Sequence, residues 1–136
     1  AISAARQSTR PRSGPGVFRQ LRNAACAASI ARIWAADLQM TPDGRFLYAS
    51  ERTRSEIALM RVDRDTGRLG YVTRYATEAQ PRGIGIDASG RVLIATGEKS
   101  DQLSVYRIDA ESGELALASR APAGTGANWV EIVSFR

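Results

Sequence analysis

Short runs in which apolar residues alternate with polar or small residues fill the chain from residue 37 onward, and helical periodicity is absent there. In 56–62, Ile57, Leu59 and Arg61 lie on one side and polar or small residues on the other. A period of two is typical of a β-strand with one buried face. The pattern predicts β-segments at 37–40, 45–50, 56–62, 69–75, 83–87, 91–96, 103–108 and 115–120.

Turn-forming residues separate these segments. Pro42 and Gly44 follow the first segment, and Gly67 follows Asp65 between the third and fourth segments. Proline and glycine at these positions favour tight turns. The sequence therefore predicts antiparallel hairpins.

The chain repeats itself every 46 residues, because 35–69 aligns with 81–115 without a gap. The matched positions include Leu38 with Ile84, Gly44 with Gly90, Leu47 with Leu93, Val62 with Ile108 and Gly67 with Gly113. Val130 and Ile132 begin a third copy in the same register. Four antiparallel strands in about 40–50 residues are typical of a propeller blade.

We therefore predict an all-β fold, a partial β-propeller with blades at 33–78 and 79–124 and the first strand of the next blade at 125–136. Propellers close with about 4–8 blades. Two blades alone would leave exposed the faces that neighbouring blades normally cover. We expect either the C-terminal part of a longer protein or assembly with further copies, and the sequence favours the former.

The composition of the 136 residues excludes several classes of site. The chain contains no histidine, which argues against histidine-based triads and most zinc sites. Cys26 is the single cysteine, so no internal disulfide can form. No apolar run reaches the length of a membrane helix. We expect no metal and no cofactor.

The net charge of +5 comes from the N-terminal segment. Residues 1–32 contain six arginines and no acidic residue, whereas the remaining residues carry 13 basic and 14 acidic side chains. The repeats therefore lack a basic surface for nucleic acid. Three interpretations of 1–32 remain open: a disordered tail, a transit-like leader, or non-native sequence read out of frame.

The connections 51–55, 77–82 and 97–101 lie at one end of the predicted blades. Loops on a rigid scaffold commonly carry function. There Arg52 and Arg82 could clamp an anion, since guanidinium groups bind oxyanions through two donors. The remaining candidates are Asp37 or Glu98 as a carboxylate base and Lys99 as a solvated neighbour. For each of these residues the alternative is an ordinary solvated side chain on the protein surface.

We assign Trp34, Phe46 and Tyr48 to the core and Trp129 to packing against a neighbouring blade.

Specific motifs point to a family. Trp34–Asp37, Thr41–Thr53, Gln80–Gly83, Gly97–Ser100 and Ala127–Val130 strongly resemble the lactonase family of seven-bladed propellers, over about residues 33–136. The resemblance implies metal-free hydrolysis of 6-phosphogluconolactone to 6-phosphogluconate in the pentose phosphate pathway, in the cytoplasm.

The resemblance also assigns roles. Arg52 corresponds to the arginine at the family's channel mouth and is implied to be catalytic. Arg82 matches the family's Pro-Arg motif and is implied to bind substrate, and we expect Asp37, Glu98 and Lys99 from the same end of the blades to contact it as well. The family's proposed acid–base histidine and glutamate lie in earlier blades, so we expect this chain alone to be inactive. Relatives often carry Gln or Asn at the position of Glu98, and an acid there would repel an anionic substrate. The alternatives are a binding or scaffolding propeller without catalysis, and a truncated or frame-shifted product without function.

Overall fold

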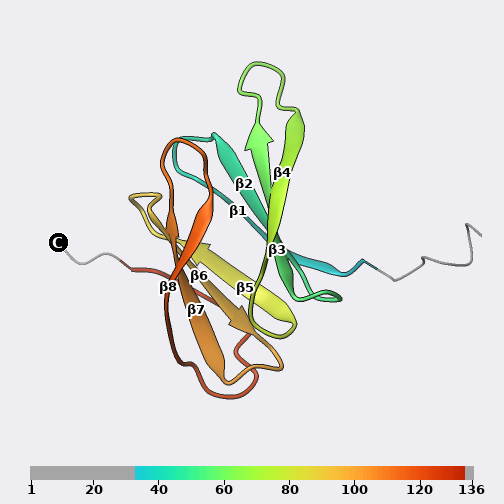
Figure 1. Ribbon diagram of the computed structural model, residues 1–136, viewed down its shortest axis with the longest axis vertical. Coiled ribbons are helices and arrows are strands. Elements are labelled where there is room, and N and C mark those ends of the chain that lie inside the picture. Colours follow the sequence, from blue (N-terminus) through green and yellow to red (C-terminus); the bar gives the residue numbers. More distant parts are fainter. Residues whose placement is uncertain (1–32, 134–136) are drawn as a thin grey trace, which may run out of the picture. The chain divides into compact units, whose positions relative to one another are not determined.

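Eight strands form two four-stranded antiparallel sheets in the computed structural model, which describes residues 33–133 (Figure 1). The predictions for residues 1–32, including Cys26, lie outside the described residues. The first sheet contains β1 (Ala35–Met40), β2 (Phe46–Glu51), β3 (Glu56–Val62) and β4 (Leu69–Ala76). The second contains β5 (Pro81–Ile86), β6 (Val92–Gly97), β7 (Gln102–Ile108) and β8 (Leu115–Pro122). The all-β propeller prediction is confirmed.

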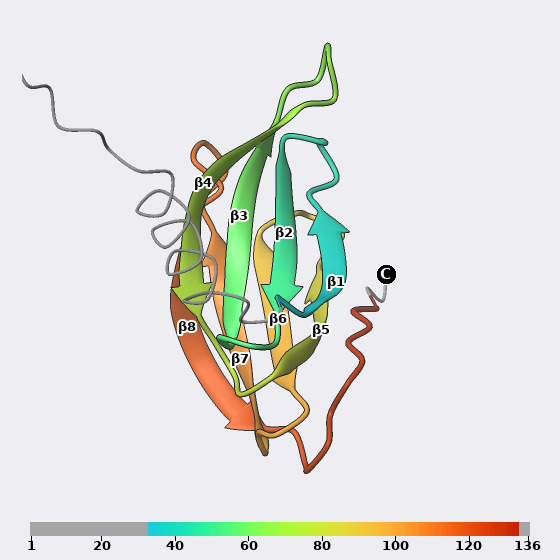
Figure 2. The same cartoon turned by 90° about the vertical axis from the view of Figure 1, so that its right-hand side faces the viewer.

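Each sheet follows the sequence order of its strands, as a propeller blade does (Figure 2). The irregularities of the backbone repeat as well. The register shifts between Ala35 and Leu38 in the first blade and between Pro81 and Ile84 in the second. A second shift falls after Leu59 and again after Val105. The 46-residue repeat therefore includes the bulges of each blade.

One apolar core joins the two sheets. Its buried side chains come from both blades: Phe46, Tyr48, Ile57, Leu59, Ile84, Leu93, Ala95, Tyr106, Ile108 and Leu115. The alternating pattern of β2 and β3 directs every second side chain toward this core. The Tyr48 hydroxyl donates a hydrogen bond of 2.6 Å to the carbonyl of Gly113 in the turn between β7 and β8. The blades are therefore held together by polar as well as apolar contacts.

The core assignment of Phe46 and Tyr48 is correct, but that of Trp34 is wrong. Trp34 is 57% exposed because it precedes β1 at the edge of the first sheet. Trp129 is 76% exposed within the described residues, so its packing on a further blade stays a prediction.

The segment after β8 runs back along β5 (Figure 2). A Cβ atom added at Gly83 would lie 2.8 Å from the Asn128 carbonyl oxygen, and one at Gly85 would lie 2.8 Å from a Val130 methyl group. The segment thus packs closely against β5, and its role as the first strand of a further blade stays a prediction. No strand is assigned to it among the described residues.

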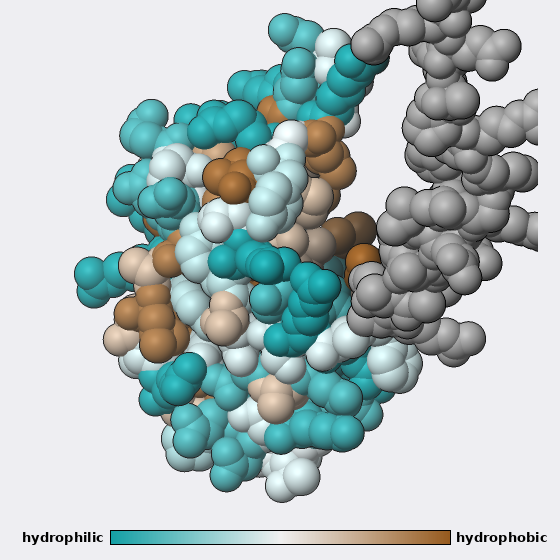
Figure 3. Space-filling model, turned by 45° about the vertical axis from the view of Figure 1, so that its right-hand side comes forward, coloured by the Kyte–Doolittle hydropathy of each residue, from teal (hydrophilic) through white to brown (hydrophobic). Residues whose placement is uncertain are grey.

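Apolar side chains also remain exposed on edge strands of both sheets. The exposed ones on β1, β4 and β8 are Leu38, Met40, Leu69, Tyr71, Val72 and Leu117. On the face shown in Figure 3, brown apolar patches are separated by teal hydrophilic side chains.

Candidate functional site

The connections predicted to share one end of the blades are joined by hydrogen bonds. The amides of Thr77 and Gln80 donate to the carbonyl and the hydroxyl of Ser55, at 3.0 and 3.1 Å. The Glu98 amide donates to the Gln80 carbonyl at 3.0 Å. Ser55 and Gln80 both adopt positive φ angles, of 59° and 52°. Such backbone conformations cost free energy and persist only where the surrounding contacts hold them. The hydrogen bonds therefore fix the backbone at this end of the blades, formed by 51–55, 77–82 and 97–101, which we call the mouth.

Arg52 lies buried at the mouth, with only 7% of its surface exposed. Its amide donates to the Trp34 carbonyl at 2.9 Å, and its guanidinium lies 3.9 Å from the centre of the Trp34 ring. A guanidinium over an indole face is attracted by the ring quadrupole. The Nη2 group of Arg52 pairs with the Glu98 carboxylate. Its Nε is buried and has no hydrogen-bond partner.

Glu98 connects the two predicted arginines. The same Oε2 atom that pairs with Arg52 lies 3.5 Å from Nη1 of Arg82, whose side chain is half exposed. Glu98 occupies the position in the second blade that Arg52 occupies in the first, 46 residues earlier. Equivalent positions of neighbouring blades therefore carry opposite charges and meet.

Asp37 links the blades through its side chain. Its Oδ2 accepts a hydrogen bond of 3.1 Å from the Ile84 amide, and its Oδ1 accepts one of 2.8 Å from the Leu38 amide. The Asp37 amide donates to the Ser50 hydroxyl at 2.9 Å. With both oxygens bonded to backbone amides, Asp37 is placed to join β1 to β5.

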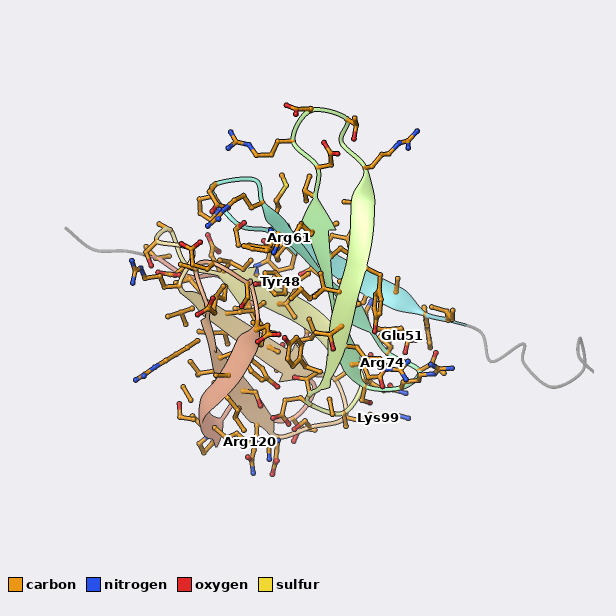
Figure 4. All side chains as sticks on the ribbon, turned by 45° about the horizontal axis from the view of Figure 1, so that its top comes forward. Tyr48, Glu51, Arg61, Arg74, Lys99 and Arg120 are labelled. Carbon is orange, nitrogen blue, oxygen red and sulfur yellow. The ribbon has the colours of Figure 1, made fainter. Side chains whose placement is uncertain are left out.

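Glu51 and Lys99 lie toward the same end of the blades, away from Arg61 (Figure 4). Burial opposes ionisation of Glu51, but hydrogen bonds from the amides of Trp34, Arg54 and Thr53 outweigh it and lower its pKa to about 2. Glu51 therefore anchors the start of the 52–55 loop. The side chain of Lys99 is exposed.

Two residues that lie at the mouth, Trp34 and Glu78, were not identified as mouth residues from the sequence. Trp34 supports Arg52, and the repeat offers no signal for it because Gln80, at the equivalent position, is not aromatic. Glu78 is buried, accepts hydrogen bonds of 2.6 Å from the hydroxyls of Ser100 and Ser104, and lies 3.4 Å from Nε of Arg120. Its place in the 77–82 connection was visible, but no spacing distinguished it from a surface acid.

The arrangement suits oxyanion binding. Two guanidinium groups face one carboxylate, which leaves a net positive charge at Arg52, Arg82 and Glu98. Residues 33–133 contain no group of three or more potential metal-binding side chains of the His, Cys, Asp and Glu types. In the same stretch, no helix is long and apolar enough to cross a membrane.

Comparison with known proteins gives consistent results. The family model described as lactonase, seven-bladed β-propeller, matches residues 8–132, which extends further toward the N-terminus than the motifs indicated. The chain is 48% identical over 101 residues to the 6-phosphogluconolactonase of Serratia proteamaculans, covering 74% of this chain and 30% of that protein. It is 42% identical over 106 residues to that of Blochmanniella pennsylvanica, covering 78% and 32%.

The fold is also similar to solved structures. The periplasmic gluconolactonase of Pseudomonas aeruginosa superposes with a TM-score of 0.68 at 27% identity, covering 74% of this chain and 29% of that one. The chain thus spans about 30% of the length of the curated relatives that it matches.

Proposed function

This chain belongs to the lactonase family of seven-bladed β-propellers, and on that basis we propose that the whole propeller hydrolyses 6-phosphogluconolactone to 6-phosphogluconate in the pentose phosphate pathway. In this reaction water adds to the lactone carbonyl, the ring C–O bond breaks, and the product releases a proton at neutral pH. The observation that carries the proposal is Arg52, a buried guanidinium stacked on Trp34 at the mouth.

Arg52 is proposed to stabilise the negative charge that develops on the carbonyl oxygen. Preorganised donors are most effective where water is excluded, and Arg52 is buried. Arg82 is more exposed and is proposed to bind the substrate's phosphate together with Lys99. Guanidinium groups stay protonated and cannot act as the base. We propose that another blade of the same ring supplies the residue that activates water.

The two blades are proposed to work within a closed ring. Exposed apolar side chains on both blades support this, because further blades or a second copy of the chain would cover them. The blade boundaries are proposed at 33–78 and 79–124, with the next blade starting at 125. The isolated chain is therefore expected to be inactive.

The proposed location is the cytoplasm, because the substrate is a phosphorylated intermediate of central sugar metabolism. The periplasm is the alternative location, because the fold is similar to that of a periplasmic gluconolactonase. Separation of periplasmic and cytoplasmic fractions of the source cells, followed by immunoblotting, tests the location. Recovery in the periplasmic fraction would contradict it.

A chimera tests the activity. The matching segment of the Serratia proteamaculans relative is replaced by the 101 residues of this chain that align with it. Proton release from freshly generated 6-phosphogluconolactone is then followed. We expect hydrolysis above the spontaneous rate by the chimera and none by this chain alone.

Substitution of arginines in the chimera tests the role of Arg52. Arg52→Gln should lower kcat/KM by about 100-fold or more, as loss of one oxyanion donor does. Arg64→Gln, which removes the same charge from the exposed turn between β3 and β4, should leave kcat/KM unchanged. A folded chimera without hydrolysis would contradict the proposed function and favour a binding or scaffolding propeller. Equal effects of the two substitutions would contradict the role of Arg52.

A further inference from the structure

The carboxylate of Glu98 lies where an anion shared by Arg52 and Arg82 would lie. One of its oxygens pairs with Arg52 and also lies 3.5 Å from Arg82. Arginine pairs that converge on a single oxygen are typical of phosphate and carboxylate sites. In this protein the oxygen at the convergence point belongs to the protein itself.

The loop that carries Glu98 is held in place. Its amide donates to the Gln80 carbonyl at 3.0 Å, and the Lys99 amide donates to the Ala79 carbonyl at 3.2 Å. A Cβ atom added at Gly97 would lie 2.9 Å from the Cβ of Glu78, so the backbone is closely packed against the connection between the blades. The carboxylate is therefore presented to the arginines by a fixed backbone. Its side chain is 36% exposed, which leaves room to rotate toward solvent.

We propose that Glu98 is an internal counterion that occupies the anion-binding position of Arg52 and Arg82, and that an oxyanion of the substrate, for which inorganic phosphate is the probe, binds there by displacing it. Glu98 is thus a specificity-determining residue, because it weakens phosphate binding relative to a site without the carboxylate. The inference rests on the proposed function for the identity of the substrate, but it concerns only anion binding.

Charge and hydrogen bonding both support displacement of the Glu98 carboxylate by phosphate. Arg52 Nε is buried without a partner while Glu98 is in place, so the carboxylate satisfies the guanidinium incompletely. A phosphate has three terminal oxygens that can accept hydrogen bonds, whereas Glu98 has two. Two guanidinium groups against one carboxylate also leave a positive charge that favours an incoming dianion. A bound phosphate beside a retained Glu98 would suffer like-charge repulsion.

Trp34 provides a direct readout of the site. Its ring lies 3.9 Å from the Arg52 guanidinium, so displacement of Glu98 should change the indole emission. The exposed Trp129 is replaced by Phe in all samples to remove its signal. The complete 136-residue chain is then titrated with inorganic phosphate, as wild type, Glu98→Gln and Glu56→Gln.

Glu56→Gln is the matched control. Glu56 lies 3.5 Å from Arg74 in a pair within the first blade, so its substitution changes the net charge equally without altering the pairs of Glu98. We expect Glu98→Gln to lower the dissociation constant for phosphate by about tenfold, since one charge-assisted hydrogen bond is of that order. The control should stay within about twofold of wild type. If Glu98→Gln fails to fold, Glu98→Ala is measured in the same way.

Each outcome decides the inference. Equal or weaker phosphate binding by Glu98→Gln would overturn it, because Glu98 would then orient the arginines rather than compete for them. Absence of phosphate binding in all variants would overturn both the inference and the proposed anion site. Tighter binding by Glu98→Gln together with an inactive chimera would support the inference and contradict the proposed function. The dissociation constant for acetate, titrated as a monoanion, should change less on Glu98→Gln than the dissociation constant for phosphate.

Discussion

The repeat supplies a controlled test of how the second blade packs on the first. Gly67 and Gly113 end the same turn in the two blades, with φ angles of 70° and 76°. A Cβ atom added at Gly67 would meet nothing within 4 Å. One added at Gly113 would lie 2.5 Å from a ring carbon of Phe46 in the other blade. Alanine therefore causes the same backbone strain at both glycines and a steric clash at Gly113 alone.

The expected costs follow from these contacts. Alanine with a positive φ costs about 1 kcal/mol, which Gly67→Ala should approach. The Phe46 ring is 1% exposed, and the guanidinium groups of Arg45 and Arg61 lie 5.3 and 5.1 Å from its centre. Because the ring has little room to move, the clash at Gly113 should add about 2 kcal/mol, as overpacking of a core does. Gly113→Ala should then cost about 3 kcal/mol in total.

Urea unfolding of the complete chain, followed by circular dichroism, measures the difference. For a domain of this size, 2 kcal/mol corresponds to a midpoint shift of about 1 M urea. The Gly67→Ala protein provides the control for backbone strain. Free energies of unfolding that differ by less than about 0.5 kcal/mol between the two variants would refute the close packing of the turn on Phe46.

Three further predictions concern single side chains. Tyr48→Phe should lower the free energy of unfolding by about 1 kcal/mol in urea, because the Gly113 carbonyl loses its partner, whereas Tyr71→Phe on the exposed face of β4 should not change it. The pKa of Glu51 is lowered to about 2 from an ordinary value of 4.5, so its ionised form stabilises the fold above about pH 4.5, and this contribution is lost as the pH falls toward 2. The difference in melting temperature between wild type and Glu51→Gln should therefore shrink over that range, and a constant difference would contradict the amide contacts. Trp34→Leu should lower the free energy of unfolding by about 1 kcal/mol through loss of the Arg52 stack, and an unchanged urea midpoint would contradict it.

The strands could be predicted from the sequence because their signals are local. Alternating side chains and glycine turns placed β3 at the observed residues, and the repeat carried the same prediction into the second blade. The first strand of each blade begins earlier than predicted. Both β1 and β5 contain a register shift near their start, and such a bulge interrupts the alternation that marks a strand.

The candidate site was predictable only in part. Topology indicated that the connections 51–55, 77–82 and 97–101 share one end, and the hydrogen bonds of Ser55 and Gln80 agree with this. The pairing of Arg52 with Glu98 depends on the distance between blades, which no spacing within one blade contains. Trp34 was assigned to the core because large aromatic residues usually are buried. Its exposure follows from its position before β1, where Arg52 covers one face of the ring.

The meeting of Arg52 with Glu98 restricts how this propeller could arise or be rebuilt by duplication. Copying the first blade in tandem would place arginine against arginine at every junction, and copying the second would place glutamate against glutamate. Buried or half-buried like charges at such short range repel strongly. Tandem copies of either blade are therefore disfavoured at this one position. The opposite charges at this junction also favour the observed pairing of the two different blades over a pairing of two copies of the same blade.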